Sequence, residues 1–254
     1  MFVQFYENII LKNPKFIFVI LLITLISFGY HAKDFRLDAS SETLLIEGDP
    51  DLEYLQEISK RYGSKEFLIL TYTPNEGMVS DNSINNLLSL KYKIQSLNWV
   101  HSVITLLDIP LLNSSEAPLQ DRLKSFKTLK DEDVDRERGF REIVSSPVFR
   151  NFVISEDGKT SGIIVNIKKN SDSEDFNNKS RDEIEKLKDQ IKKQNHQNIL
   201  EIRDVIESYQ DIGKIHLGGI PMIADDMMSF IKSDIIVFGI GVFLFIIATL
   251  WFVF

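Results

Sequence analysis

Two long apolar blocks lie near the ends of the chain, and a region of mixed polar and apolar positions separates them. "FIFVILLITLISFGY" covers Phe16–Tyr30, and "IIVFGIGVFLFIIATLWFVF" covers Ile235–Phe254. The second block has twenty consecutive residues without a charge. At a rise of ~1.5 Å per residue, a helix of that length covers the ~30 Å hydrocarbon core of a bilayer. We therefore predict a transmembrane helix over 235–254.

The first block is shorter and has two interpretations. An apolar helix can extend over 15–32 and form a first transmembrane helix. The alternative is a signal peptide, with Lys12 and Lys15 as its basic region and Ser27–Gly29 as its cleavage site. The leader 1–14 favours the transmembrane helix, because its large apolar side chains suit an interfacial helix better than a basic leader.

Residues 33–234 are predicted to fold as one domain outside the membrane. In its first half, the spacing of apolar residues and the Gly and Pro boundaries indicate a β-α-β unit over 64–108, preceded by a capped helix. The elements of this half are a helix over 49–63, a strand over Glu66–Thr73, a helix over Asp81–Leu97 and a strand over Val100–Leu107.

The second half is predicted to repeat the first with an added hairpin, in the order β-β-α-β over 148–220. Two β-rich runs flank the turn Asp157-Gly158. A long helix follows over 180–210, which the polar stretch Gln194–Asn198 is expected to interrupt, and a short strand over 214–219 ends the domain. The fold class is α+β: ferredoxin-like β-α-β repeats, with helices on one face of a mixed sheet, between two transmembrane helices.

Between the two halves, residues 109–147 contain a stretch that is dense in charges of both signs and poor in apolar residues. This pattern is typical of a solvated helical connector. The alternative is a specific docking surface.

Composition excludes several functions. The net charge is −8, which disfavours nucleic acid, since phosphate binding needs clustered Lys and Arg. The chain has no cysteine, so disulfide scaffolds and thiolate metal sites are excluded. It also lacks hydrolase, zinc-protease and phosphate-loop motifs, and its four histidines have no ligand spacing. We expect no catalytic residue, no metal and no cofactor.

The stretch "HLGGIPMIADDMMSFIKSD" joins the domain to the second apolar block. Its candidate functional residues are Gly218, Gly219, Pro221, Asp225, Asp226 and Asp234. We expect the glycines to end the last strand, Pro221 to turn the chain, and the aspartates to lie in the water-facing first turns of a helix that enters the bilayer at Ile235. Acids at a helix N-terminus interact favourably with its dipole. The alternative is a role in coupling or substrate entry, because carboxylates near a membrane interior are often functional.

The order of these parts resembles the resistance–nodulation–division transporters, in the branch of hydrophobe exporters and mycobacterial-membrane-protein-large (MMPL) relatives. The similar segments are "NPKFIFVILLITLISFGY", "EGDPDLEYLQEISKRYGSKEFLILTYT", "SSPVFRNFVISEDGKTSGIIVNI" and "HLGGIPMIADDMMSFIKSD". They resemble, in turn, the first transmembrane helix, the acidic-Pro helix before the first porter strand, the proline before a hairpin, and the Gly-Gly-x-Pro passage into the second transmembrane helix.

This resemblance implies a proton-driven, multi-pass transporter of the bacterial inner membrane, with twelve helices in two similar halves. It would export lipids or other amphiphiles through porter domains in the periplasm or outside the cell. The sequence ends at the second helix, so it is expected to be the N-terminal part. The family's proton-relay acids lie on the fourth helix and its symmetry mate and are not in this sequence. The expected partners are the bilayer, an amphiphilic substrate and the remaining transmembrane half; the sequence allows an oligomer but does not fix its state.

Two other functions compete with this interpretation. The first is a self-contained two-helix membrane protein with an extracytoplasmic sensing or ligand-binding domain. The second is a membrane-anchored enzyme, which the missing motifs disfavour. If the porter interpretation is right, an apolar groove is expected between the two β-α-β halves, because binding sites favour such interfaces. Residues 36–232 are then expected to fold alone and to bind a lipid-like ligand.

Overall fold

The structure is a computed structural model of the whole chain, which forms two compact units, Met1–Asp38 and Ala39–Phe254. The residues it describes are 14–32, 66–112, 126–168 and 180–253, with positions 50, 51, 54, 57, 58 and 61 between them. The expected interfacial segment lies outside the described residues, apart from its last position, as do 33–49 and 113–125. The expected helix over 49–63 is described at six positions, all of which are helical.

In the first unit, the described residues form one apolar helix, α2 (Pro14–Ala32). Proline suits the first turn of a helix, because the N–H that it lacks would have no partner inside the helix. Nearly all side chains of α2 are exposed, including Phe18, Leu25 and Phe28. The helix therefore has no buried face of its own.

The second unit is built on a four-stranded sheet. In chain order its elements are β1 (Phe67–Pro74), α4 (Asp81–Gln95), β2 (Val100–Ile104), η3 (Leu106–Asp108), α6 (Arg136–Ser145), β3 (Ser161–Ile167), α7 (Arg181–Glu207), η5 (Gln210–Ile212), β4 (Gly213–Gly218) and α8 (Ile220–Val253). We call residues 66–219 the sheet domain. The α+β class is confirmed, and the strand predicted over Val100–Leu107 is shorter, because η3 follows it.

All strand pairs in this sheet are antiparallel, and the order is β2-β3-β1-β4. The expectation of a mixed sheet is therefore wrong. The reason is that the two β-α-β units interleave: β3 lies between β1 and β2, and β1 lies between β3 and β4. The parallel strands of each unit are consequently never neighbours.

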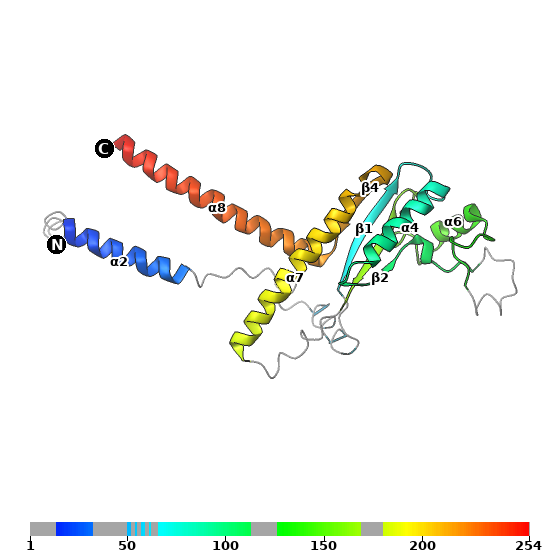
Figure 1. Cartoon of the computed structure of the whole chain (residues 1–254), viewed down its shortest axis with the longest axis horizontal. Helices are drawn as coiled ribbons and strands as arrows, with labels where there is room; N and C mark the ends of the chain where they lie inside the picture. The colour runs from blue at the N-terminus through cyan, green and yellow to red at the C-terminus, as the bar shows by residue number, and fades with distance from the viewer. Residues whose placement is uncertain are drawn as a thin grey trace. The chain divides into compact units, whose positions relative to one another are not determined.

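One face of the sheet carries the core. Along β1 the side chains of Leu68, Leu70 and Tyr72 are fully buried, and they alternate with the more exposed Phe67 and Ile69. Register places Ile163 and Val165 of β3 opposite Leu70 and Leu68. The apolar faces of α4 and α7 pack on this side of the sheet and complete the core (Figure 1).

The charged connector is part of this core, so a purely solvated connector is wrong for its described residues. Leu129, Val134 and Ile143 are buried, and α6 begins at an Asp135 side chain that accepts a hydrogen bond from the Arg138 amide at 3.1 Å. A Cβ on Gly139 would come within 3 Å of the Leu111 and Leu129 side chains. A few well-placed apolar residues therefore anchor a segment whose composition is mostly polar.

The first strand of the predicted hairpin does not form. Residues 147–153 turn instead, with Asn151 in the left-handed region at φ 63°, and only isolated bridges connect Ile154 to its neighbours. Three amides, those of Phe152, Val153 and Ile154, donate to the Phe149 carbonyl. The Asp157-Gly158 turn is present: Gly158 has φ 69°, and Asp157 accepts from the Lys159 amide at 3.1 Å. Turn chemistry outweighs β propensity in this segment.

The last part of the domain leads directly into α8. The expected break at Gln194–Asn198 is absent, since α7 is continuous from Arg181 to Glu207. β4 ends at Gly218, and α8 begins at Ile220, so Gly219 alone joins strand to helix. Pro221 lies in the first turn of α8 rather than in a separate turn.

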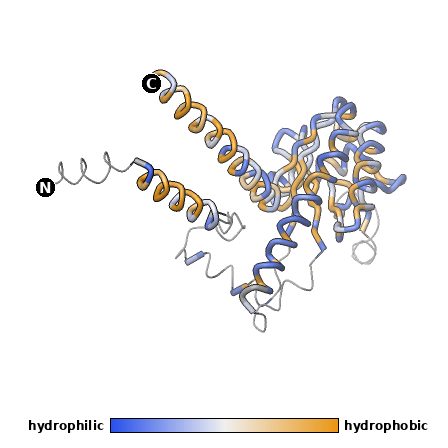
Figure 2. Tube along the Cα trace, turned by 60° about the vertical axis from the view of Figure 1, so that its left-hand side comes forward, coloured by the Kyte–Doolittle hydropathy of each residue, from blue (hydrophilic) through white to orange (hydrophobic). Residues whose placement is uncertain are grey.

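Among the described residues, Ile220–Phe252 form the one helix that is long and apolar enough to cross a membrane, by length and composition. Figure 2 shows hydrophobic residues along most of α8, whereas the N-terminal half of α7 is hydrophilic. The other apolar helix, Lys15–His31, is shorter. One helix thus has the length and composition to cross a membrane among the described residues, where two were expected.

Candidate functional site

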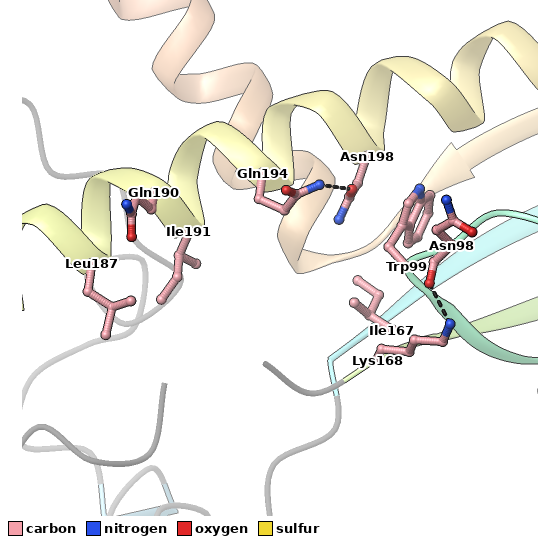
Figure 3. Close-up of a pocket in the computed structure, with 9 residues that line it drawn as sticks. All are labelled: Asn98, Trp99, Ile167, Lys168, Leu187, Gln190, Ile191, Gln194 and Asn198. Carbon is pink, nitrogen blue, oxygen red and sulfur yellow. Dashed lines mark hydrogen bonds between the residues drawn. The ribbon is translucent and has the colours of Figure 1, made fainter. Parts of the chain in front are cut away.

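A pocket of about 380 Å³ lies between α7 and the sheet end at which β2 begins and β3 finishes (Figure 3). We call it the α7 pocket. Its lining residues come from both β-α-β halves: Asn98, Trp99, Ile167, Lys168, Leu187, Gln190, Ile191, Gln194 and Asn198. Its volume is within the ~300–1,000 Å³ that is common for small-molecule sites.

Helix periodicity explains one wall of the α7 pocket. Leu187, Ile191, Gln194 and Asn198 are three or four residues apart, so they lie along one side of α7. In Figure 3 Leu187, Ile191 and Asn198 lie on the lower side of α7, and the Gln194 side chain points toward Asn198. The indole of Trp99 is 8% exposed, and its Nε1 donates to Glu201 Oε2 at 2.9 Å. This hydrogen bond ties α7 to the start of β2.

Polar groups in the α7 pocket are already held in place. The Lys168 side chain donates to the Asn98 carbonyl, and its backbone amide donates to the Trp99 carbonyl at 2.8 Å. Gln194 Nε2 donates to Asn198 Oδ1 at 2.9 Å. A cation and several amides thus border the apolar side chains of Ile167, Leu187 and Ile191. The pocket is amphipathic, and five of its nine lining residues are polar, whereas we expected an apolar groove.

Lys168 is the one charged residue among the described residues that line the α7 pocket, and no carboxylate is among them. No nucleophile with an adjacent base lines it either. Among the residues that the structure describes, no group of three or more His, Asp or Glu could hold a metal ion.

The candidate residues of the strand-to-helix junction separate into two groups. Gly218 is the last residue of β4 and pairs with Ile69 of β1. Gly219 has φ +120°, and an added Cβ would lie 3.0 Å from the Phe67 carbonyl oxygen, so glycine is required at this crossing. Together with the buried Pro221, these residues set the direction in which α8 leaves the sheet.

Asp225 and Asp226 contact α7, and their side chains are 11% and 30% exposed. Asp225 accepts from His196 Nδ1 at 2.9 and 3.0 Å, and Asp226 accepts from Arg203 Nη2 at 2.8 and 2.9 Å. A third contact is polar but uncharged: Asn195 Nδ2 donates to the Pro221 carbonyl at 2.9 Å. We call these three contacts the α7–α8 joint. Each of these two acids therefore has a specific partner on another helix, in addition to its position in the first turns of α8.

Asp234 is separate from the joint. It lies about two turns further along α8, is exposed, and makes no ion pair with the described residues. It therefore remains the acid at the start of the apolar run, as we expected, and only Asp225 and Asp226 are brought to the joint.

Sequence reasoning missed the residues of α7. His196 was one of four scattered histidines, and Asn195 belonged to a stretch that was expected to break the helix. One signal was available: His196 and Arg203 are seven residues apart and therefore lie on the same side of a continuous helix. Trp99 and Lys168 of the α7 pocket had no sequence signal, since they become neighbours only through strand pairing.

Comparison of the sequence with protein-family models and with curated protein sequences found no match.

Proposed function

We propose that this chain is the N-terminal part of a proton-driven exporter of the resistance–nodulation–division type, in the MMPL-like branch, and that the sheet domain guides a lipid or another amphiphile. The observation that carries this proposal is the junction of β4 and α8. A domain of two interleaved β-α-β units connects through one residue to a long apolar helix. Such a direct connection suits a domain that acts at the membrane surface.

The strand order supports the finer fold assignment within this proposal. Two β-α-β units that form an antiparallel sheet of order β2-β3-β1-β4 correspond to the split β-α-β, or ferredoxin-like, arrangement. Porter modules of this transporter family are expected to have that arrangement. Under the proposal, α2 and α8 are the first two transmembrane helices, in a bacterial inner membrane, with the sheet domain outside the cytoplasm.

The chemistry of the α7 pocket supports an amphiphilic substrate. Leu187, Ile191 and Ile167 offer apolar contact to a tail, while Lys168 and the amide side chains can hydrogen-bond to a headgroup. Charge-assisted hydrogen bonds from a cation are stronger than those between neutral groups. We therefore expect long-chain amphiphiles with an anionic headgroup to bind more tightly than those with a cationic one.

Trp99 gives a direct test of this proposal. The chain has two tryptophans, so Trp251→Phe leaves Trp99 as the single reporter in the full chain reconstituted in phosphatidylcholine nanodiscs. A brominated long-chain fatty acid is expected to quench Trp99 in a saturable manner. Ile191→Asp should weaken this binding by about tenfold or more, because it places a charge against the apolar tail. Leu200→Asp is the matched control on α7, since Leu200 is 48% exposed and lies outside the pocket.

The possible outcomes separate the two main functions. Saturable binding that Ile191→Asp weakens and Leu200→Asp preserves supports an amphiphile-guiding domain. No quenching by anionic, zwitterionic and cationic brominated amphiphiles would contradict it and favour the sensing-domain alternative. Sequencing the reading frame beyond the codon for Phe254 tests the exporter itself: further hydrophobic segments are expected, and an immediate stop codon would favour the self-contained protein.

A further inference from the structure

The α7–α8 joint contains one histidine, His196. Histidine titrates between about pH 5 and 8, whereas arginine and asparagine do not. His196 Nδ1 lies 2.9 Å from one Asp225 oxygen and 3.0 Å from the other. The imidazole therefore faces both carboxylate oxygens.

The burial of the Asp225 carboxylate increases the difference between a neutral and a charged hydrogen bond from His196. The Asp225 side chain is 11% exposed, while that of His196 is 49% exposed. The carboxylate has therefore lost most of its water, but the ring can still exchange protons with solvent. A neutral ring gives this carboxylate one ordinary hydrogen bond. A protonated ring gives it a charge-assisted bond, which is roughly twice as strong.

The other charged groups near the His196–Asp225 pair lie on α8 and on α7. From α8, Asp225 contacts the ring, while the neighbouring Asp226 is engaged by Arg203. On α7 itself, Lys192 and Lys193 lie one turn before His196, and the uncharged Ile199 and Leu200 lie one turn after it.

The strands that pack against α8 add no charge at the joint. β1 has no charged residue. On β4, Lys214 and His216 alternate with Ile215, which packs against the core, so they lie on the opposite face of the sheet from α7. The titratable partner that faces His196 across the helix interface is therefore Asp225.

From these contacts we propose that the α7–α8 joint is proton-dependent: protonation of His196 tightens the attachment of α8 to the sheet domain, and deprotonation loosens it. The contacts from Asn195 and Arg203 persist at either pH, so the joint loosens without coming apart. The direction of α8 relative to α7 is thus better defined at pH 5 than at pH 8. This inference does not depend on the proposed function.

Spin labels can measure this attachment directly, because the chain has no native cysteine. Leu200→Cys on α7 and Met227→Cys on α8 are both at exposed positions. In the full chain in phosphatidylcholine nanodiscs, pulsed electron resonance gives the distance distribution between the two labels. We expect one narrow component at pH 5 and an additional broad component at pH 8. The ratio of the two components should change by about fivefold between these pH values, as expected when a charged hydrogen bond replaces a neutral one.

Three variants make the result decisive. His196→Gln keeps a hydrogen-bond donor but does not titrate, so its distribution should be the same at pH 5 and pH 8. Arg203→Gln removes the second charged contact and should enlarge the pH response. His216→Gln, which changes a histidine on the open sheet face, should leave the response intact.

Two outcomes would overturn the proposal. One is a distribution that is independent of pH both in the labelled parent and in Arg203→Gln. The other is a pH response that persists in His196→Gln, since that result would assign the titration to another group.

Discussion

Replacing Asp108 with asparagine is expected to destabilise the sheet domain by about 3 kcal/mol, because the change leaves a buried lysine without its counter-charge. Asp108 Oδ1 accepts from the side chains of Lys91 and Lys130, and Oδ2 accepts from the amide and hydroxyl of Thr105. The Lys91 side chain is 10% exposed and that of Lys130 is 37% exposed. Most of the loss should therefore come from Lys91.

This magnitude can be measured as a change in the thermal midpoint. For a unit of this size, ~3 kcal/mol corresponds to a decrease of ~6–12 °C. Trp99 fluorescence in the Trp251→Phe background reports unfolding of the sheet domain in the full chain. Asp133→Asn is the matched control, since Asp133 forms an exposed ion pair with Lys127. It should shift the midpoint by no more than about 2 °C, because exposed pairs contribute little.

The effect of Asp108→Asn should depend on pH in a defined direction. Burial would raise the pKa of Asp108, but hydrogen bonds from Lys91, Lys130 and Thr105 outweigh burial and lower the pKa below its ordinary value of 3.8. A carboxyl with a lowered pKa in the folded state adds stability above its unfolded-state pKa, and this contribution is lost as the pH falls through the folded-state value. The difference between parent and variant should therefore be largest at neutral pH and should shrink below about pH 3.8.

A second substitution tests whether buried charge is the cause. Adding Lys91→Met to Asp108→Asn removes the unpaired ammonium, so more than half of the lost stability should return. If Lys91→Met restores nothing, the loss comes from the Thr105 hydrogen bonds instead. If Asp108→Asn itself shifts the midpoint no more than Asp133→Asn does, the argument from a buried ion pair is wrong.

Two further substitutions test the connector and the junction in the same thermal assay. Ile143→Ala should cost ~2–5 kcal/mol, because it removes most of a side chain that is 1% exposed in the core; a midpoint within 2 °C of the parent would place the connector outside the core. Gly219→Ala should cost ~1–3 kcal/mol of backbone strain at φ +120°, whereas Gly239→Ala, which has open space around its Cα, is the control and should have no measurable effect on the sheet domain.

The elements that could be predicted from the sequence are those in which local pattern and tertiary packing agree. β1 combines β-rich residues with a closing proline, and α4 has its buried Ile84, Leu87, Leu90 and Ile94 at helical spacing. The segment 148–154 is equally rich in β-forming residues, but it turns at Asn151 because its carbonyl and amide groups find partners within the segment and along the edge of β3. Such a choice depends on contacts that a sequence pattern does not contain.

The α7–α8 joint could not be predicted, for a related reason. The partners in the pairs His196–Asp225 and Arg203–Asp226 are 29 and 23 residues apart in sequence. Read locally, the polar run Gln194–Asn198 resembles a break in a helix, since it has little apolar periodicity. In the folded chain Gln194 bonds to Asn198, and Asn195 and His196 have partners on α8. Tertiary hydrogen bonds thus satisfy the groups that would otherwise end the helix.

The position of α7 explains how the two candidate regions can act together. One side of α7 lines the α7 pocket through Gln194 and Asn198, and the adjoining residues Asn195 and His196 hold α8. Among the described residues, α8 is also attached through the short passage from β4, an edge strand, and through packing against β1 and β4. A displacement of α8 therefore acts on α7 at the same turns that form the pocket wall. If the domain guides an amphiphile, α7 is the element through which movement of the membrane helix can change the shape of the binding site.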